Sequence, residues 1–151
     1  MLSKQDRMLL KLLQKEARLS ITKLAERVNM SESTCARRVR SLEETGIISH
    51  YSVQIDPEKL GYNVSAYVIV RLDQRTETDA KKFFDAVGKE DRIVEAVAVT
   101  GTPDLILRIV AKNMEDFTDL TMHGILRHKS VRDISSCMVM KQIKPDNGFP
   151  V

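Results

Sequence analysis

The sequence predicts an α+β protein in two parts: an N-terminal winged helix-turn-helix and a C-terminal ferredoxin-like βαββαβ domain. Two observations lead to this prediction. In the first third of the chain, apolar residues recur at helical spacing in three short segments, each preceded by a serine that can cap a helix. From Tyr62 onward the apolar period falls to two, and strand-like and helix-like segments follow in the order β-α-β-β-α-β. A chain of 151 residues suffices for two small domains.

Residues 1–50 are expected to hold three helices. Ser3 and Ser20 cap the first and second, and the second, "ITKLAERVN", is only about two turns long. Ser31 caps a longer third helix, which Gly46 ends as a residue of left-handed conformation. A short helix, a tight turn and a longer helix, with a supporting helix in front, match the helix-turn-helix plan. In that plan the last helix enters the major groove of DNA.

The third helix, "SESTCARRVRSLEETG", separates an apolar seam from a charged face. At about 100° per residue, Cys35, Val39 and Leu42 lie within about 60° of one another. This seam is expected to be buried, with Cys35 as a small core residue. The opposite face is expected to carry Ser33, Arg37, Arg40 and Glu44. Arg38 falls on the shoulder of the seam. We expect it to lie along the helix bundle and pair with an acid of a neighbouring helix, with DNA contact as its alternative role.

The outward face of this helix has the chemistry to bind DNA. The planar guanidinium of arginine binds guanine or phosphate through two hydrogen bonds, and a helix N-terminus favours phosphate. The basic excess lies at the same end of the chain: residues 1–50 hold ten Lys and Arg against six Asp and Glu, whereas residues 51–151 hold fourteen against fifteen. The candidate DNA-contacting residues are Ser31, which is also the N-cap, with Ser33, Thr34, Arg37, Arg38 and Arg40.

The segment "IISHYSVQIDPEKLG" follows the third helix. Its alternating apolar residues favour an extended strand, which "DP" ends. This strand would be either a wing or a link to the next domain. The expected boundaries are a helix-turn-helix domain at 1–50, a linker strand at 51–61, a ferredoxin-like domain at 62–143 and a tail at 144–151.

The C-terminal domain is expected to be a four-stranded antiparallel sheet with both helices on one face. Its strands are "YNVSAYVIVRL", "IVEAVAV", "LILRIVA" and "VRDISSCMVMKQI", and its helices are "ETDAKKFFDAVG" and "MEDFTDLTMHGILRH". Tyr67 and Ile69, and likewise Ile106 and Val110, are apolar residues on the second face of this sheet. A sheet that is wet on one face alternates cleanly between apolar and polar residues. The second face is therefore expected to be buried in a homodimer.

The run "DRMLLKLLQKEARLSITKLAERVNMSESTCARRVRSLEETGIISHY", followed by "VTGTPD", resembles the Lrp/AsnC family of feast/famine transcription regulators. The resemblance covers nearly the whole chain. Its markers are Asp6-Arg7, Ala17-Arg18, Leu24-Ala25, Ser31, Arg38-Val39, Leu42, Gly46-Ile47-Ile48, Gly61, Gly101 and Asp104. It implies double-stranded DNA as a partner, and dimers that often assemble into octamer-like discs. It also implies that a small molecule, usually an amino acid, binds between dimers near the glycine loop, which is "TGTPD" here.

The glycine loop has groups that suit an amino acid effector. Gly101 allows a tight turn and a close approach of the backbone to a ligand. The N–H groups of Thr100, Gly101 and Thr102 could hold an α-carboxylate, and Asp104 could hold an α-ammonium. The resemblance adds Ser136 of a facing subunit, where the family often has a hydroxyl residue. The alternative is a plain hairpin turn, with Gly101 present for its dihedral angle and Asp104 for a local turn bond.

Pro103 departs from the family pattern, which often has an aromatic residue just before the loop aspartate. This departure puts the family's effector preference in doubt. The methionine and aliphatic residues around the neighbouring strands favour a small, apolar amino acid as the effector.

The remaining features argue against an enzyme or a membrane protein. His123 and His128 are five residues apart, about 140° around a helix, so they do not converge as metal ligands do. We expect no catalytic residue, metal or cofactor. The alternatives are a siroheme-decarboxylase-like enzyme, whose fold resembles the family, and a regulator whose C-terminal domain only oligomerises. The two cysteines, Cys35 and Cys137, fall in different parts, which indicates a reduced, cytoplasmic protein. The chain has no apolar run of about eighteen residues.

Overall fold

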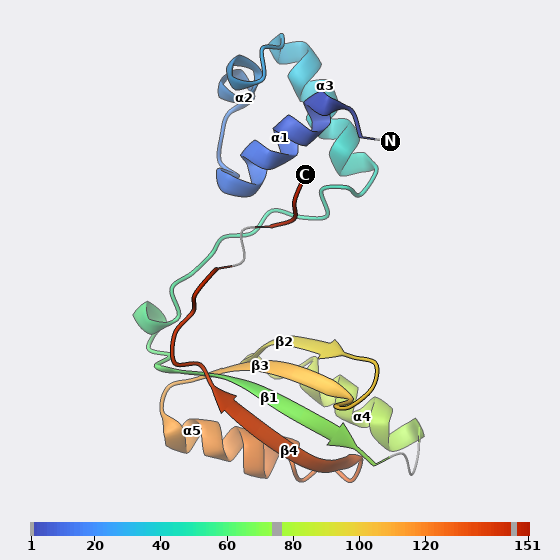
Figure 1. The fold of residues 1–151 in the computed structure, drawn as a ribbon, viewed down its shortest axis with the longest axis vertical. Helices are drawn as coiled ribbons and strands as arrows, with labels where there is room; N and C mark the ends of the chain where they lie inside the picture. Colours follow the sequence, from blue (N-terminus) through green and yellow to red (C-terminus); the bar gives the residue numbers. More distant parts are fainter. Residues whose placement is uncertain (1, 74–76, 146–147) are drawn as a thin grey trace. The chain divides into compact units, whose positions relative to one another are not determined.

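The computed structural model describes residues 2–73, 77–145 and 148–151, which fall into two compact units (Figure 1). The first unit is made of Met1–Gln54 together with Ile143–Val151, and the second of Ile55–Gln142. The chain therefore passes from the first unit to the second and then returns to the first. Among the described residues, no helix is both long enough and apolar enough to cross a membrane.

The first unit is a helix-turn-helix built from α1 (Lys4–Lys15), α2 (Ile21–Arg27) and α3 (Glu32–Glu44). Each helix begins at the serine that the sequence predicted. The side chains of Ser3, Ser20 and Ser31 each accept a hydrogen bond from the backbone N–H three residues later. These bonds satisfy N–H groups that have no partner within the helix, so each cap fixes the start of its helix.

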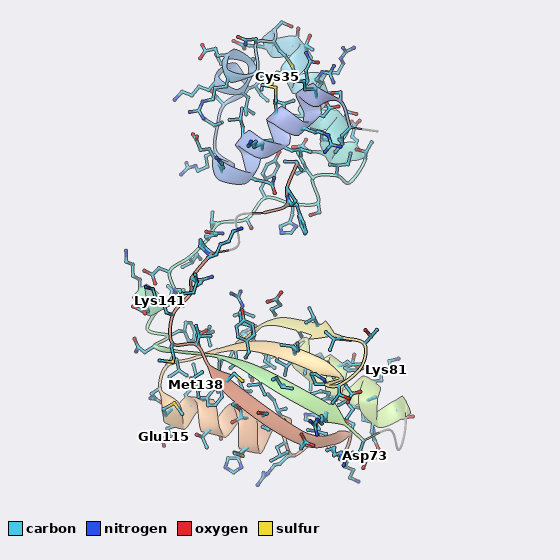
Figure 2. All side chains as sticks on the ribbon, viewed as in Figure 1. Cys35, Asp73, Lys81, Glu115, Met138 and Lys141 are labelled. Atoms are coloured by element: carbon cyan, nitrogen blue, oxygen red, sulfur yellow. The ribbon has the colours of Figure 1, made fainter. Side chains whose placement is uncertain are left out.

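The core of the first unit lies between the three helices. Its buried members are Leu9, Leu13, Leu24, Ala25, Val28, Cys35 and Val39. Cys35 is fully buried beside the helices (Figure 2), and this burial raises the pKa of its thiol. It is therefore the neutral core residue that the sequence predicted. Gly46 follows α3 with a φ of 71°, in the predicted left-handed conformation.

Residues 51–56 are extended but form no strand, although the sequence predicted one. Tyr51, Val53 and Ile55 are exposed by 49%, 75% and 61%. A strand needs a neighbour to complete its backbone hydrogen bonds, and this segment pairs with no strand in the described part of the chain. The segment leads into a short 3₁₀ helix, η1 (Glu58–Leu60).

The second unit is a four-stranded antiparallel sheet with helices packed on one face (Figure 1). The strands are β1 (Val64–Leu72), β2 (Ile93–Ala98), β3 (Leu105–Ala111) and β4 (Val131–Met138), in the spatial order β2-β3-β1-β4. The helices are α4 (Glu77–Val87), between β1 and β2, and α5 (Met114–Thr118), between β3 and β4. This order and pairing confirm the predicted ferredoxin-like arrangement.

The core of the second unit lies between the sheet and its helices. Val68 of β1 pairs with Leu107 of β3 near its centre, and both side chains are fully buried. Phe83 of α4 and Phe117 of α5 belong to the same buried cluster. The loop of the β2–β3 hairpin, residues 99–104, lies at one end of this sheet and outside the buried core.

The second helix of this unit changes type along its length, whereas the sequence predicted one helix over 114–128. After α5, the backbone continues as a π-helix, η2 (Asp119–Ile125). The hydroxyl of Thr121 donates to the carbonyl oxygen of Phe117 at 2.8 Å, and such back-bonding competes with the α-helical pattern. Leu126 N–H then bonds to the carbonyl oxygen of Thr121, five residues earlier, as in a π-helix.

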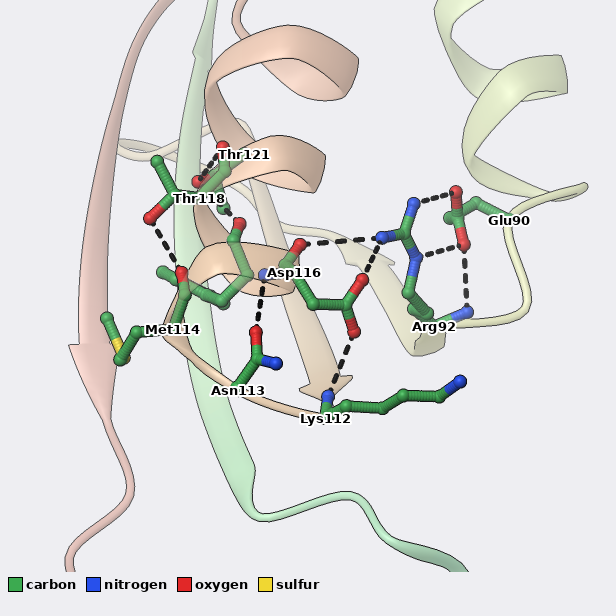
Figure 3. A network of polar contacts seen from close by, with 9 residues as sticks. Glu90, Arg92, Lys112, Asn113, Met114, Asp116, Thr118 and Thr121 are labelled. Carbon is green, nitrogen blue, oxygen red and sulfur yellow. Dashed lines mark hydrogen bonds and ion pairs between the residues drawn. The ribbon is translucent and has the colours of Figure 1, made fainter.

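A network of charged residues closes the end of the sheet opposite the hairpin (Figure 3). The Arg92 guanidinium donates to Glu90 at 2.8 and 2.9 Å and to Asp116 at 2.6 Å. Asp116 also accepts a hydrogen bond from Lys112 N–H at 2.9 Å. Glu90 and then Asp116 raise the pKa of Arg92, while Lys112 N–H and then Arg92 lower the pKa of Asp116. The network joins the residues before β2 to the start of α5.

Candidate functional site

The two faces of α3 are separated as the sequence predicted. Cys35, Val39 and Leu42 are exposed by only 0%, 7% and 4%, so the apolar seam is buried. Arg37 and Arg40 are exposed on the opposite side of the helix. Neither guanidinium has a salt-bridge partner among the described residues. Both are therefore available to an anionic ligand.

Arg38 has a partner within its own unit. Its Nη1 atom donates to Asp6 Oδ1 at 2.9 Å and to Ser3 Oγ at 3.3 Å. Asp6 Oδ2 in turn accepts from the Ser3 hydroxyl at 2.6 Å and from the Ser3 N–H at 3.0 Å. The Ser3 hydroxyl first, and then the Ser3 N–H and the Arg38 guanidinium, lower the pKa of Asp6. The arginine thus joins α3 to the capped start of α1, which is the acid pairing that the sequence predicted.

Three hydroxyl groups gather at the N-terminus of α3. Ser31 Oγ accepts from Thr34 N–H at 3.3 Å, donates to Thr34 Oγ1 at 2.8 Å, and lies 3.3 Å from Ser33 Oγ. Ser31 and Ser33 are exposed. Glu32 lies in the same first turn, and its negative charge opposes phosphate there. A contact with the base edges of DNA is compatible with this mixture of hydroxyl and carboxylate groups.

The sequence did not reveal a contact between α3 and the segment that follows it. Tyr51 Oη donates to Glu43 Oε1 at 2.8 Å. Partial burial and then the Glu43 carboxylate raise the pKa of Tyr51 to about 12. The two residues lie on either side of the turn at Gly46, so no helical or strand periodicity relates them. The bond connects the segment that follows α3 to the last turn of α3.

The β2–β3 loop holds four of the five predicted effector residues. Thr100, Gly101 and Thr102 are exposed, and Gly101 has a φ of 89°, which only glycine adopts without strain. Asp104 is half-buried, and its Oδ2 atom accepts from Leu72 N–H of β1 at 2.7 Å. The aspartate therefore bonds the neighbouring strand, rather than the local turn that the alternative interpretation invoked.

Ser136 does not meet this loop within one chain. It pairs with Val68, whereas the residue at the loop end of β3, Leu105, pairs with Val70 and, through it, with Ile134. Since neighbouring strands are about 4.8 Å apart, β4 and β3 are separated by roughly 10 Å. The structure of one chain therefore does not bring Ser136 beside the loop.

The second face of the sheet has an uncovered apolar patch, which the ion pairs Arg108–Glu95 (3.7 Å) and Arg71–Asp133 (3.9 Å) border. Tyr67 of β1 and Val97 of β2 are each exposed by 42%, and Ile69 and Ile106 lie between them as a cross-strand pair. Within the described residues, no helix packs on this face. Cys137 is a free, exposed thiol opposite Tyr67. No group of three or more metal-ligating side chains occurs in the described parts of the chain.

Two family models match this architecture. Residues 65–149 match the Lrp/AsnC ligand binding domain, and residues 2–49 match a winged helix-turn-helix DNA-binding domain. The chain belongs to the Lrp/AsnC family. The descriptions of the two models assign DNA binding to the helix-turn-helix unit and ligand binding to the sheet unit.

Individual transcriptional regulators match nearly the whole chain. An HTH-type transcriptional regulator of Haemophilus influenzae is 33% identical, with 98% of this chain and 88% of that protein covered. The leucine-responsive regulatory protein of Rhizobium meliloti is 32% identical, with 92% and 89% covered. A transcriptional regulator of Neisseria meningitidis, crystallised as a complex with L-Met, superimposes with a TM-score of 0.95 at 31% identity, over 99% of this chain and 97% of that one.

Proposed function

We propose that this Lrp/AsnC member is a sequence-specific regulator of transcription whose assembly or DNA binding responds to a small, apolar amino acid. The observation that carries the proposal is the division of α3 into a buried seam and an exposed face with Arg37 and Arg40. The exposed basic face supports recognition of DNA, and the ligand-binding domain of the same chain supports regulation by a small molecule.

In the proposed DNA complex, α3 lies in the major groove. Arg37 and Arg40 contact guanine or phosphate, and Ser31, Ser33 and Thr34 contact base edges or phosphate at the start of the helix. Arg38 holds α3 against α1 through Asp6, and only the part of its side chain that remains exposed can contact DNA. The proposal therefore assigns two of the three arginines to recognition and one to positioning.

In the proposed effector site, the N–H groups of Thr100, Gly101 and Thr102 bind the α-carboxylate. Asp104 Oδ2 is held by Leu72 N–H, which leaves Oδ1 for the α-ammonium. Ser136 comes from a neighbouring chain. The L-Met complex of the Neisseria relative supports an amino acid as the ligand, and methionine is itself apolar.

The proposed assembly is a homodimer that joins the uncovered sheet faces, with further association of dimers to an octamer. An exposed apolar face of this kind costs free energy in water, and pairing two copies removes it. We place the regulator in the cytoplasm, where both cysteines would stay reduced. The proposal includes no catalytic step, metal or cofactor.

The test is selection of DNA from a randomised pool, followed by binding measurements with each of the twenty amino acids. We expect a preferred sequence to be enriched, and one or a few apolar amino acids to change its affinity or the size of the complex. Failure to enrich any sequence would contradict the DNA-binding function. Enrichment without any response to amino acids would favour a C-terminal domain that only oligomerises.

A further inference from the structure

The C-terminal residues belong to the DNA-binding unit rather than to the unit that contains β4. The contact is made by Gln14, an exposed residue near the end of α1. Gln14 Nε2 donates to the carbonyl oxygen of Phe149 at 3.1 Å, and Phe149 N–H donates to Gln14 Oε1 at 2.6 Å. The side-chain amide of Gln14 thus forms hydrogen bonds with both the N–H and the carbonyl oxygen of Phe149, as a neighbouring strand would.

Glycine is required next to this contact. Gly148 has a φ of 81°, in the region that favours glycine. A Cβ atom at this position would collide with Gln14 Oε1 and would lie 2.7 Å from Gln14 Cδ. The absence of a side chain at Gly148 is therefore what allows the terminal backbone to approach α1 closely enough for both hydrogen bonds.

The chemistry of the contact makes it specific for an amide and reversible. A primary amide offers a donor and an acceptor side by side, whereas lysine offers only donors and glutamate only acceptors. The Phe149 side chain is 84% exposed, so no apolar pocket holds the segment. Hydrogen bonds exposed to water stabilise only weakly, and ordering a chain terminus costs conformational entropy. The hydrogen bonds outweigh this entropy only slightly, so the segment can dock and release.

We propose that residues 148–151 form a C-terminal strap, which docks on α1 through Gln14 and ties the end of β4 to the helix-turn-helix unit. The chain then connects its two units twice, once through residues 51–57 and once through the strap. A docked strap restricts the reorientation of the helix-turn-helix unit and so lowers the entropy that this unit must lose when it binds. Docking itself does not depend on the proposed function, but its relevance to DNA does.

The first test measures docking at Phe149 N–H. Protein labelled with ¹⁵N-phenylalanine gives only four backbone signals, because the chain has four phenylalanines. We expect hydrogen exchange at Phe149 to be roughly fivefold slower than in a disordered tail, the effect of one hydrogen bond of ordinary net strength. Gln14→Leu and Gly148→Ala should each abolish this protection. Hydrogen exchange at Phe149 in the double variant should be no faster than in either single variant. Gln5→Leu, which changes another exposed glutamine of α1, is the matched control.

The second test measures the restraint on the helix-turn-helix unit. A dye is attached at Lys23→Cys on α2 in a Cys137→Ala background, and its anisotropy decay is resolved in time. The amplitude of fast segmental motion should rise in Gln14→Leu and Gly148→Ala and stay at the parent level in Gln5→Leu. Unprotected exchange at Phe149 in the parent, or the same segmental motion in all variants, would overturn the strap. Neither readout uses DNA or an amino acid, so a failed DNA selection leaves both results interpretable.

Discussion

Arg38 Nη1 lies 2.9 Å from Asp6 Oδ1, and this ion pair connects the middle of α3 with the first turn of α1. Asp6 also completes the capping box of α1 with Ser3. One carboxylate therefore caps its own helix and positions the helix that is expected to read DNA. Of the three arginines of α3, only Arg38 lies beside the buried seam and has this ion pair, whereas Arg37 and Arg40 are exposed.

We predict that Arg38→Ala lowers the stability of the helix-turn-helix unit by about 1–2 kcal/mol, because Asp6 loses a charged hydrogen-bond donor in a partly buried position. Thermal unfolding followed by circular dichroism would measure the loss. Arg37→Ala, an exposed change on the same helix, is the control and should leave the melting temperature unchanged. A variant that loses DNA affinity at unchanged stability would show that Arg38 acts on DNA instead.

The Asp6 contacts predict a dependence of stability on acid pH. The ordinary pKa of this carboxyl, 3.8, is lowered in the folded protein, so the folded state favours the ionised form more than the unfolded state does. The resulting stabilisation is complete above about pH 5 and is lost as the pH falls through 3.8 towards the folded pKa. Chemical denaturation at several pH values should show the stability difference between the parent and Asp6→Asn shrinking over this range. A difference that stays constant down to pH 3 would contradict the assignment.

We predict that Arg37→Ala and Arg40→Ala each weaken binding to a selected DNA site by about 1–3 kcal/mol, if the residue contacts a base. A residue that contacts only phosphate should instead reduce the slope of log affinity against log salt by about one. Fluorescence anisotropy titrations at several salt concentrations would distinguish these two roles. Lys81→Ala, an exposed change on α4 of the other unit, is the control. Parent-like binding by both arginine variants would remove α3 from the interface.

The uncovered sheet face predicts the oligomeric state. The parent should be at least a dimer at micromolar protein, and Ile69→Glu should shift it towards a monomer of 17.2 kDa, because a buried, unpaired carboxylate is costly in an apolar interface. Multi-angle light scattering would give both masses. Phe84→Glu, an exposed apolar residue of α4, is the matched control and should keep the parent mass. A monomeric parent would contradict burial of this face by a second copy.

The Asp104–Leu72 bond determines how the effector prediction should be tested. Asp104→Ala would remove a strand contact as well as a charge, so lost binding could reflect a distorted loop. Asp104→Asn keeps an oxygen acceptor for Leu72 N–H and removes only the charge. We expect Asp104→Asn to melt within a few degrees of the parent and to bind an amino acid at least about tenfold more weakly, because the ammonium loses a charge-assisted bond. Calorimetric titration would test this, and undiminished binding would remove Asp104 from the ammonium site.

The sequence by itself determined the features that depend on local periodicity and on short-range chemistry. The serine caps, the buried seam of Cys35, Val39 and Leu42, and the order of strands and helices all follow from side-chain spacing within about a dozen residues. The placement of Arg38 beside the seam also follows from helical geometry. Its partner, Asp6, lies 32 positions away in the sequence. Only the packing of α1 against α3 shows that Asp6 is the partner.

Only the tertiary structure decided the features in which distant backbone groups meet. Asp104 bonds the N–H of Leu72 because β1 and β3 are neighbours, so the aspartate joins two strands, a contact that neither the predicted effector role nor the alternative of a local turn bond had included. Residues 51–56 have the alternation of a strand but lack a paired neighbour, and strand formation depends on that neighbour rather than on the segment. The contact of Gln14 with Phe149 spans 135 positions and depends on a glycine whose role no periodicity indicates. Such contacts arise from how the elements are brought together, which local spacing does not specify.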